Sequence, residues 1–188
     1  AICPVVLPPA STCDASLNIG GCSTTVPQII TLLPGGGDPD FIQQGVNQGC
    51  LLFPAENFSF FYFVAGADGK FGFAVEANNS AEASDIDFNV WGPINTVEEV
   101  CDYVTNNQPI RSSYAAGADL TGLADIHPEL GTPVLDDFDC GSPATPGTGF
   151  LADDFVRRID VVEGKIYVIM LDDFGSSIEE DGISINFD

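Results

Sequence analysis

The chain has 188 residues, and its 28 Asp and Glu against 5 Lys and Arg give a formal net charge of -23 at pH 7. Such a charge repels phosphate backbones and anionic lipid surfaces, which excludes nucleic acid and membrane surfaces as expected partners. A hydrophobic fraction of 45%, with 14 Phe, excludes a generally disordered chain, and the length fits one domain with one substantial core.

Cysteine use predicts the compartment. Six cysteines without a C-x-x-C pair, together with a single histidine, indicate disulfides rather than a zinc site. No run of about 18 apolar residues is present, so membrane insertion is not expected. The chain begins at Ala1 without a signal-peptide pattern, and we expect a processed or excised piece of a secreted, extracellular or cell-surface protein.

Residues 1–48 are predicted to form a loop-rich segment that packs on the same domain as the rest of the chain. The segment is rich in Pro, Gly, Ser and Thr, and it is braced by Cys3, Cys13 and Cys22. One strand is predicted inside it, over residues 28–33.

From residue 49 to residue 188 the pattern changes to short β-type runs, which predict a β-sandwich module. The first two runs, residues 59–64 and 71–76, are separated by a turn over residues 67–70. They are therefore interpreted as a hairpin.

Residues 85–91 alternate between apolar and polar side chains. A strand with this pattern presents one face to the core and the other to solvent. Asp85, Asp87 and Asn89 share one side, so we expect an exposed acidic face.

A short helix is predicted next, because Thr96 and Glu99 have capping-box spacing and valines recur at three and four residues up to Val104. A long irregular stretch follows over residues 108–150, with an acidic insertion around residues 125–154. Irregular segments of this length inside a compact domain are usually functional or mobile.

The last third is the most regular part of the chain. Strands are predicted over residues 155–161, 165–171 and 182–187, and the second is apolar on both faces. Many strands with at most one short helix define an all-β fold, an antiparallel β-sandwich or jelly roll with long loops.

Carboxylates at strand ends form the clearest candidate site. Asp85 and Asp87 open one strand, and Asp172 and Asp173 directly follow another. Calcium prefers carboxylate and carbonyl oxygens, and loops at one end of a sandwich can converge on such an ion. The sequential calcium-loop motif fails, because Val90 stands where its glycine belongs, so any site must be assembled from distant segments. The alternative is an exposed acidic rim with no bound ion.

Catalysis is not expected, and the chain is interpreted as a non-enzyme. With 28 acidic residues, two carboxylates at the spacing of a glycoside hydrolase are easy to find by chance. His127 precedes a proline in the irregular stretch, and no G-x-S-x-G motif is present. Among the aromatic residues, Trp91 is the candidate for a glycan contact, although a structural role in covering the end of a sheet is the stronger interpretation.

The order of the motifs resembles the CUB-like or pre-peptidase-C-terminal-like jelly-roll modules of large secreted adhesins and gliding-motility surface proteins of Bacteroidota. The resemblance covers roughly residues 45–188 as a dispersed pattern. Its segments are Gly49-Cys50-Leu51, Glu56-Asn57, Asp85 to Pro93, Pro109 to Tyr114, Thr121-Gly122-Leu123 and Leu171 to Phe174.

The resemblance implies a cell-surface or filament module, often repeated, that serves adhesion or gliding motility. It implies calcium bound by Asp85 and by Asp172 or Asp173, with Glu76 or Glu82 as a further acidic ligand. Its expected partners are a surface glycan or protein receptor, or neighbouring modules of the same protein. A carbohydrate-binding module is the alternative, and an accessory domain of a secreted hydrolase is a third hypothesis.

The chain departs from these modules in two places. Ser112 or Ser113 stands where they often carry a cysteine, and the stretch from Asp125 to Asp154 is longer and more acidic. This comparison implies a bridge from Cys101 to Cys140 and a second from Cys22 to Cys50, out of fifteen pairings that six cysteines allow.

Overall fold

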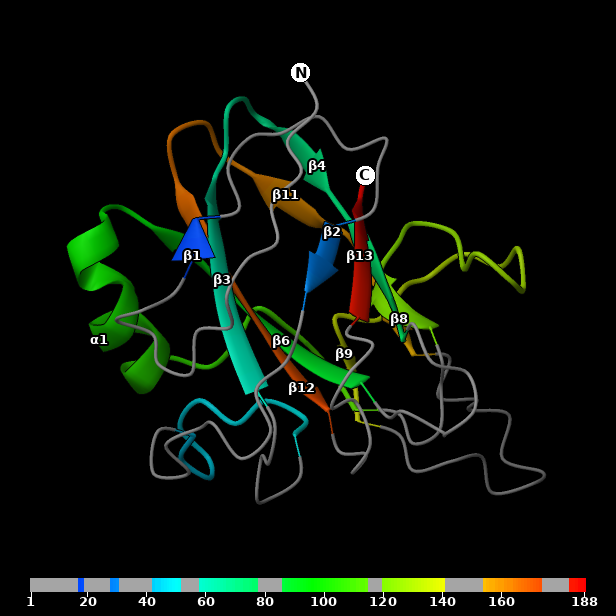
Figure 1. The fold of residues 1–188 in the computed structure, drawn as a ribbon, viewed down its shortest axis with the longest axis horizontal. Helices are drawn as coiled ribbons and strands as arrows, with labels where there is room; N and C mark the ends of the chain where they lie inside the picture. Colours follow the sequence, from blue (N-terminus) through cyan, green and yellow to red (C-terminus); the bar gives the residue numbers. More distant parts are fainter. Residues whose placement is uncertain are drawn as a thin grey trace.

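A computed structural model describes residues 17–18, 28–30, 42–51, 58–77, 86–114, 120–140, 154–173 and 183–188 (Figure 1). Within these ranges the chain forms three sheets and one short helical segment, which confirms the predicted all-β class. No helix among them is long and apolar enough to cross a membrane.

The largest sheet has six strands, and its two longest members, β6 and β12, lie side by side at its centre (Figure 1). In spatial order the strands are β1 (Leu17–Asn18), β3 (Phe58–Val64), β12 (Ile166–Asp173), β6 (Ile86–Ile94), β7 (Arg111–Ser113) and β9 (Phe138–Asp139).

A second sheet has five strands, in the order β10 (Phe155–Val156), β8 (Leu120–Leu123), β5 (Phe73–Ala77), β13 (Ile183–Phe187) and β2 (Gln28–Ile30). A small third sheet pairs β11 (Ile159–Val161) with β4 (Gly69–Phe71). Most pairings are antiparallel as predicted, but β1, β9 and β10 each pair in parallel with a neighbour, so the two large sheets are mixed.

The two large sheets pack face to face through one apolar core. Phe73 of β5 meets Phe88 of β6 edge to face, with ring centroids 5.2 Å apart. The same core holds alternate residues of the central strands, among them Phe61, Val75, Val90, Ile169, Leu171, Ile183 and Ile185. The result is a sandwich-like arrangement, as the alternating sequence pattern predicts.

A second apolar core lies on the outer face of the six-stranded sheet. Residues 42–51 and a helical segment cover this face; the segment is a 3₁₀ turn (Val97–Glu99) that continues into α1 (Val100–Asn106). The side chains buried there include Ile42, Leu51, Phe58, Phe60, Trp91, Val100, Val104, Val168 and Met170. The central strands are therefore buried on both faces.

This second layer corrects the expectation of an exposed acidic face. Every residue of β6 from Ile86 to Gly92 is buried, including Asp87 and Asn89. The polar positions of the alternating pattern face a covering layer instead of water.

The predicted helix is confirmed, but the predicted capping box is wrong. The helical segment starts after Thr96, whose side chain makes no capping hydrogen bond. A backbone hydrogen bond and a second one from the Thr96 side chain lower the pKa of Glu98.

Two predicted strand connections are also wrong. Residues 59–64 and 71–76 do not pair as a hairpin, because β3 and β5 belong to different sheets and β4 between them pairs with β11. The predicted strand over residues 155–161 is divided into β10 and β11, which again lie in different sheets.

Candidate functional site

Two of the predicted carboxylates face each other across the centre of the six-stranded sheet. Asp87 of β6 and Asp172 of β12 occupy directly opposite positions in the antiparallel register. Each residue is only 1% exposed. Alternation along the strands places both on the outer face, with Trp91, Val168 and Met170 of the second core.

Opposite residues of an antiparallel pair have Cβ atoms about 5 Å apart, so the two carboxyl groups can reach a common point. Two ionised carboxylates at this separation repel each other, and burial removes the water that would screen them. A shared proton, hydrogen-bond donors or a cation can offset this charge. The arrangement therefore suits a hard cation chemically.

The remaining predicted ligands are not brought to this pair within the described residues. The backbone of Asp173 pairs in register with Ile86, one position further along the strand. Glu76 is exposed on β5 of the other sheet. Asp85 and Glu82 lie outside the described residues. Within the described ranges, no group of three or more His, Cys, Asp or Glu side chains is placed to hold a metal ion.

Asn89 is a polar neighbour of the pair that the sequence reasoning did not assign to the site. It lies two residues after Asp87, so it shares the outer face, and it is 0% exposed. Its Nδ2 donates to the carbonyl oxygen of Gln48 at 3.1 Å, whereas its Oδ1 accepts no hydrogen bond from any described residue. The signal that could have found it is the same alternation that groups it with Asp87.

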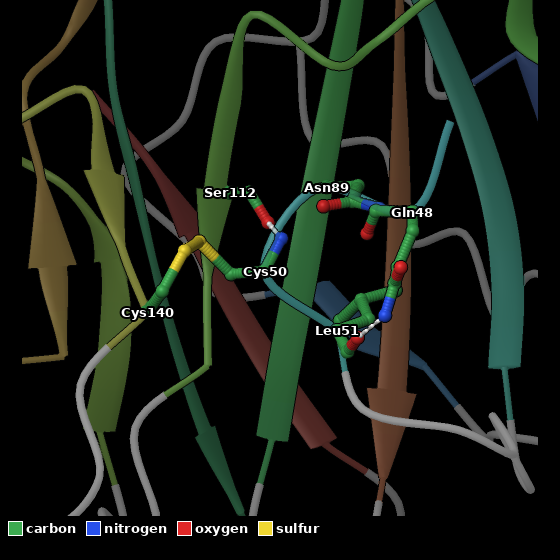
Figure 2. Close-up of a disulfide and its surroundings, with 6 residues drawn as sticks. All are labelled: Gln48, Cys50, Leu51, Asn89, Ser112 and Cys140. Atoms are coloured by element: carbon green, nitrogen blue, oxygen red, sulfur yellow. Dashed lines mark hydrogen bonds between the residues drawn. A yellow bond between two sulfur atoms is a disulfide. The ribbon is translucent and has the colours of Figure 1, made fainter. Parts of the chain in front are cut away.

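Segment 42–51 is held against this face by hydrogen bonds and by close backbone contact (Figure 2). The Cys50 N–H donates to Ser112 Oγ at 2.8 Å. Gly49 has φ +60°, and a Cβ placed there would stand 2.6 Å from both Asn89 Oδ1 and Ser112 Oγ. Only glycine fits this contact without moving a neighbour. At the other side of the segment, Asn47 Nδ2 donates to the carbonyl oxygen of Val104 at 3.0 Å.

A disulfide from Cys50 to Cys140 adds a covalent link to the same segment (Figure 2). The two Cα atoms lie 4.8 Å apart across a sequence separation of 90 residues. This bond overturns both implied pairings, Cys22 to Cys50 and Cys101 to Cys140. Cys101 is disulfide-bonded as well, to a partner outside the described residues. Cys3, Cys13 and Cys22 also lie outside them.

All three arginines meet where the chain passes from β10 to β11. Arg111 Nε donates to the carbonyl oxygen of Arg157 at 2.7 Å, and its Nη2 donates to that of Arg158 at 3.1 Å. The Asp137 carboxylate forms ion pairs with Arg157 at 2.8 Å and with Arg111 at 3.2 Å. Burial lowers the pKa of Arg111, an effect that the charge of Asp137 opposes. Asp137 thus holds the segment that connects β10 and β11, which belong to different sheets.

The burial of Trp91 contradicts its predicted role as a glycan contact. The ring is 0% exposed, and its Nε1 donates to the carbonyl oxygen of Asn107 at 3.0 Å. Stacking on a sugar requires a face open to solvent. Trp91 is instead a core residue that connects β6 to the end of α1.

Comparison of the chain with protein-family models, with curated proteins and with solved structures finds no match.

Proposed function

We propose that the chain is a non-catalytic extracellular module of a cell-surface adhesin or surface filament, stabilised by calcium at Asp87 and Asp172. The observation that carries the calcium part is the opposition of these two buried carboxylates in the register of β6 and β12. A divalent cation coordinated by both carboxylates would link β6 and β12 across the centre of the sheet.

The donor set fits calcium better than a softer metal, because it consists of oxygen atoms only. Asp87 and Asp172 would supply carboxylate oxygens, and Asn89 Oδ1 is a neutral oxygen on the same face. Asp85, Asp173 and Glu82 remain acidic ligands that the resemblance implies, whereas Glu76 is exposed on the other sheet and is not a ligand of this proposal. Such an ion would hold the sheet together and would not perform chemistry.

The module part of the proposal is supported by the sandwich-like fold, by the disulfide and by the resemblance. A jelly-roll arrangement of the CUB-like kind, repetition along a longer protein and a role in adhesion or gliding motility belong to this proposal. An acidic, disulfide-linked β domain suits an oxidising environment outside the cell. The expected partners are a surface glycan, a protein receptor or neighbouring modules.

Thermal unfolding with calcium in excess and with a chelator tests the ion. A ligand present at about 100 times its dissociation constant stabilises the native state by about 2.7 kcal/mol, which raises Tm by about 5–10 °C at this chain length. We expect the chain to show this shift. An unfolding temperature that is the same with calcium and with chelator would contradict the proposal that calcium is bound.

Two substitutions locate the site. Asp87→Asn and Asp172→Asn should each abolish the calcium-dependent shift, because each removes a charged ligand. Glu76→Gln, on the exposed face of the other sheet, is the matched control and should keep the shift. If both aspartate variants keep it, calcium binds elsewhere.

Retention on an array of surface glycans and surface proteins, with calcium and with chelator, tests the adhesive part. We expect retention that falls when calcium is removed. No retention under either condition would count against adhesion.

A further inference from the structure

Exposed apolar side chains are concentrated in one short stretch of the irregular region. Of the eight large hydrophobic side chains exposed in the described part of the chain, four lie within residues 126–138. Ile126 and Leu130 are each 54% exposed, and Leu135 is 75% exposed. Single exposed apolar residues are ordinary, whereas several of them on one short turn make that turn a candidate binding surface.

Residues 125–136, which we call the His127 turn, hold three of these side chains, Ile126, Leu130 and Leu135, on an ordered backbone. His127 Nδ1 accepts hydrogen bonds from the N–H groups of Glu129 and Leu130, both at 3.1 Å, as an N-cap side chain does. Pro128 occupies the first position of the turn, where its missing N–H has no cost. Gly131, with φ +66°, closes the turn by donating its N–H to the His127 carbonyl at 2.9 Å.

The base of the His127 turn is anchored in the protein. The His127 side chain is buried, and its ring meets Phe155 edge on, with centroids 4.9 Å apart. The Val134 N–H donates to the Asp125 carbonyl oxygen at 3.0 Å, and a β-bridge joins Ile126 to Pro133. A surface that is already ordered loses little conformational entropy when a partner binds.

The negative charge of the chain and of the His127 turn favours a positively charged partner. Asp125 is paired with Lys70, whereas Glu129 and Asp136 are exposed and form no ion pair with any described residue. The chain as a whole carries -23, so a second copy would meet strong repulsion. A cationic partner is attracted by the same field.

We propose that the His127 turn is a docking surface for a basic, amphipathic peptide segment of another protein. Apolar side chains of that segment pack on Ile126 and Leu130, and its Lys or Arg side chains pair with Glu129 and Asp136. The surface goes beyond the proposed function, because it uses neither Asp87 nor Asp172 and does not depend on calcium.

A synthetic fluorescent peptide of alternating Leu and Lys, measured by fluorescence anisotropy against the full chain, tests this surface. The double variant Ile126→Ser/Leu130→Ser keeps the net charge and should bind at least about 10-fold more weakly. The control Val97→Ser/Val162→Ser removes two aliphatic side chains, each 48% exposed, elsewhere on the surface. It should change the affinity less than about 2-fold, and both variants should keep the melting temperature of the parent.

A second pair of substitutions tests the charge contribution of Glu129 and Asp136 to peptide binding. Glu129→Gln/Asp136→Asn should weaken peptide binding several-fold and flatten its dependence on salt, because exposed charge pairs are screened. Equal affinities for both aliphatic variants, or no binding of the peptide at all, would overturn the proposal. Binding to zwitterionic lipid vesicles that is lost in Ile126→Ser/Leu130→Ser would also overturn it, because the surface would then dock on lipid.

Discussion

Replacing Gly49 with alanine tests how segment 42–51 is held against the outer face of the six-stranded sheet. At φ +60° an alanine costs about 1 kcal/mol relative to glycine. Its Cβ would also stand 2.6 Å from Asn89 Oδ1 and Ser112 Oγ and 2.7 Å from Pro109 Cγ. Relieving such overlap in a packed core costs about 1–3 kcal/mol.

A further loss comes from the hydrogen bond that the overlap displaces. If Ser112 Oγ moves away, the buried Cys50 N–H loses its acceptor, which costs about 1–2 kcal/mol. Together these terms predict that Gly49→Ala lowers the free energy of unfolding by about 3–6 kcal/mol. Gly45→Ala is the matched control, because Gly45 also has positive φ, +76°, but a Cβ there meets nothing within 4 Å. Only the backbone cost of about 1 kcal/mol applies to it.

Urea unfolding followed by the fluorescence of Trp91, the single tryptophan, measures both variants. We expect Gly49→Ala to lose at least about 2 kcal/mol more than Gly45→Ala. Losses that agree within about 1 kcal/mol would refute the reasoning, because the contact with Asn89 and Ser112 would then carry no energy.

Two further changes test other parts of the structure. Burial raises the pKa of Tyr167 above its ordinary value of 10.0, so the contribution of its neutral phenol to stability is complete below pH 10 and is lost as the pH rises through the folded-state pKa. Tyr167→Phe should cost about 1 kcal/mol near neutral pH, because the Val162 N–H loses its acceptor. Above pH 10 the free energy of unfolding of this variant, measured with urea, should fall less steeply with pH than that of the parent. Parallel pH dependences for the two proteins would contradict the raised pKa of Tyr167. Replacing both Cys50 and Cys140 with alanine opens a loop of 90 residues and should lower the free energy of unfolding by about 4–5 kcal/mol on loop entropy; a loss under about 1 kcal/mol would contradict that origin.

Local patterns in the sequence were sufficient to place many of the elements. Alternating runs identified β6 and β13, and a continuous apolar run identified β12, each to within about three residues. The valine spacing located the helical segment after Thr96. These features depend on backbone geometry and on neighbours within a few residues, which a sequence displays directly. The same alternation correctly grouped Ile86, Phe88 and Val90 on the face that forms the core between the sheets.

The failures share a different origin, because each depends on segments far apart in the chain. The pattern cannot tell that β3 and β5 join different sheets, or that Cys50 lies beside Cys140 rather than Cys22. Strand pairing and disulfide pairing follow distance in space, and no local spacing encodes that distance.

The candidate site shows both contributions together. The sequence by itself placed Asp87 in an alternating strand and Asp172 directly after an apolar one, in a chain with a large acidic excess. Only the tertiary structure decided that β6 and β12 are neighbours in a register that sets the two carboxylates opposite each other. It also decided that α1 and segment 42–51 cover this face, which turns a polar stripe expected to meet water into a buried pair. The physical reason is that alternation specifies the two faces of a strand, whereas the layer that packs on each face depends on the whole fold.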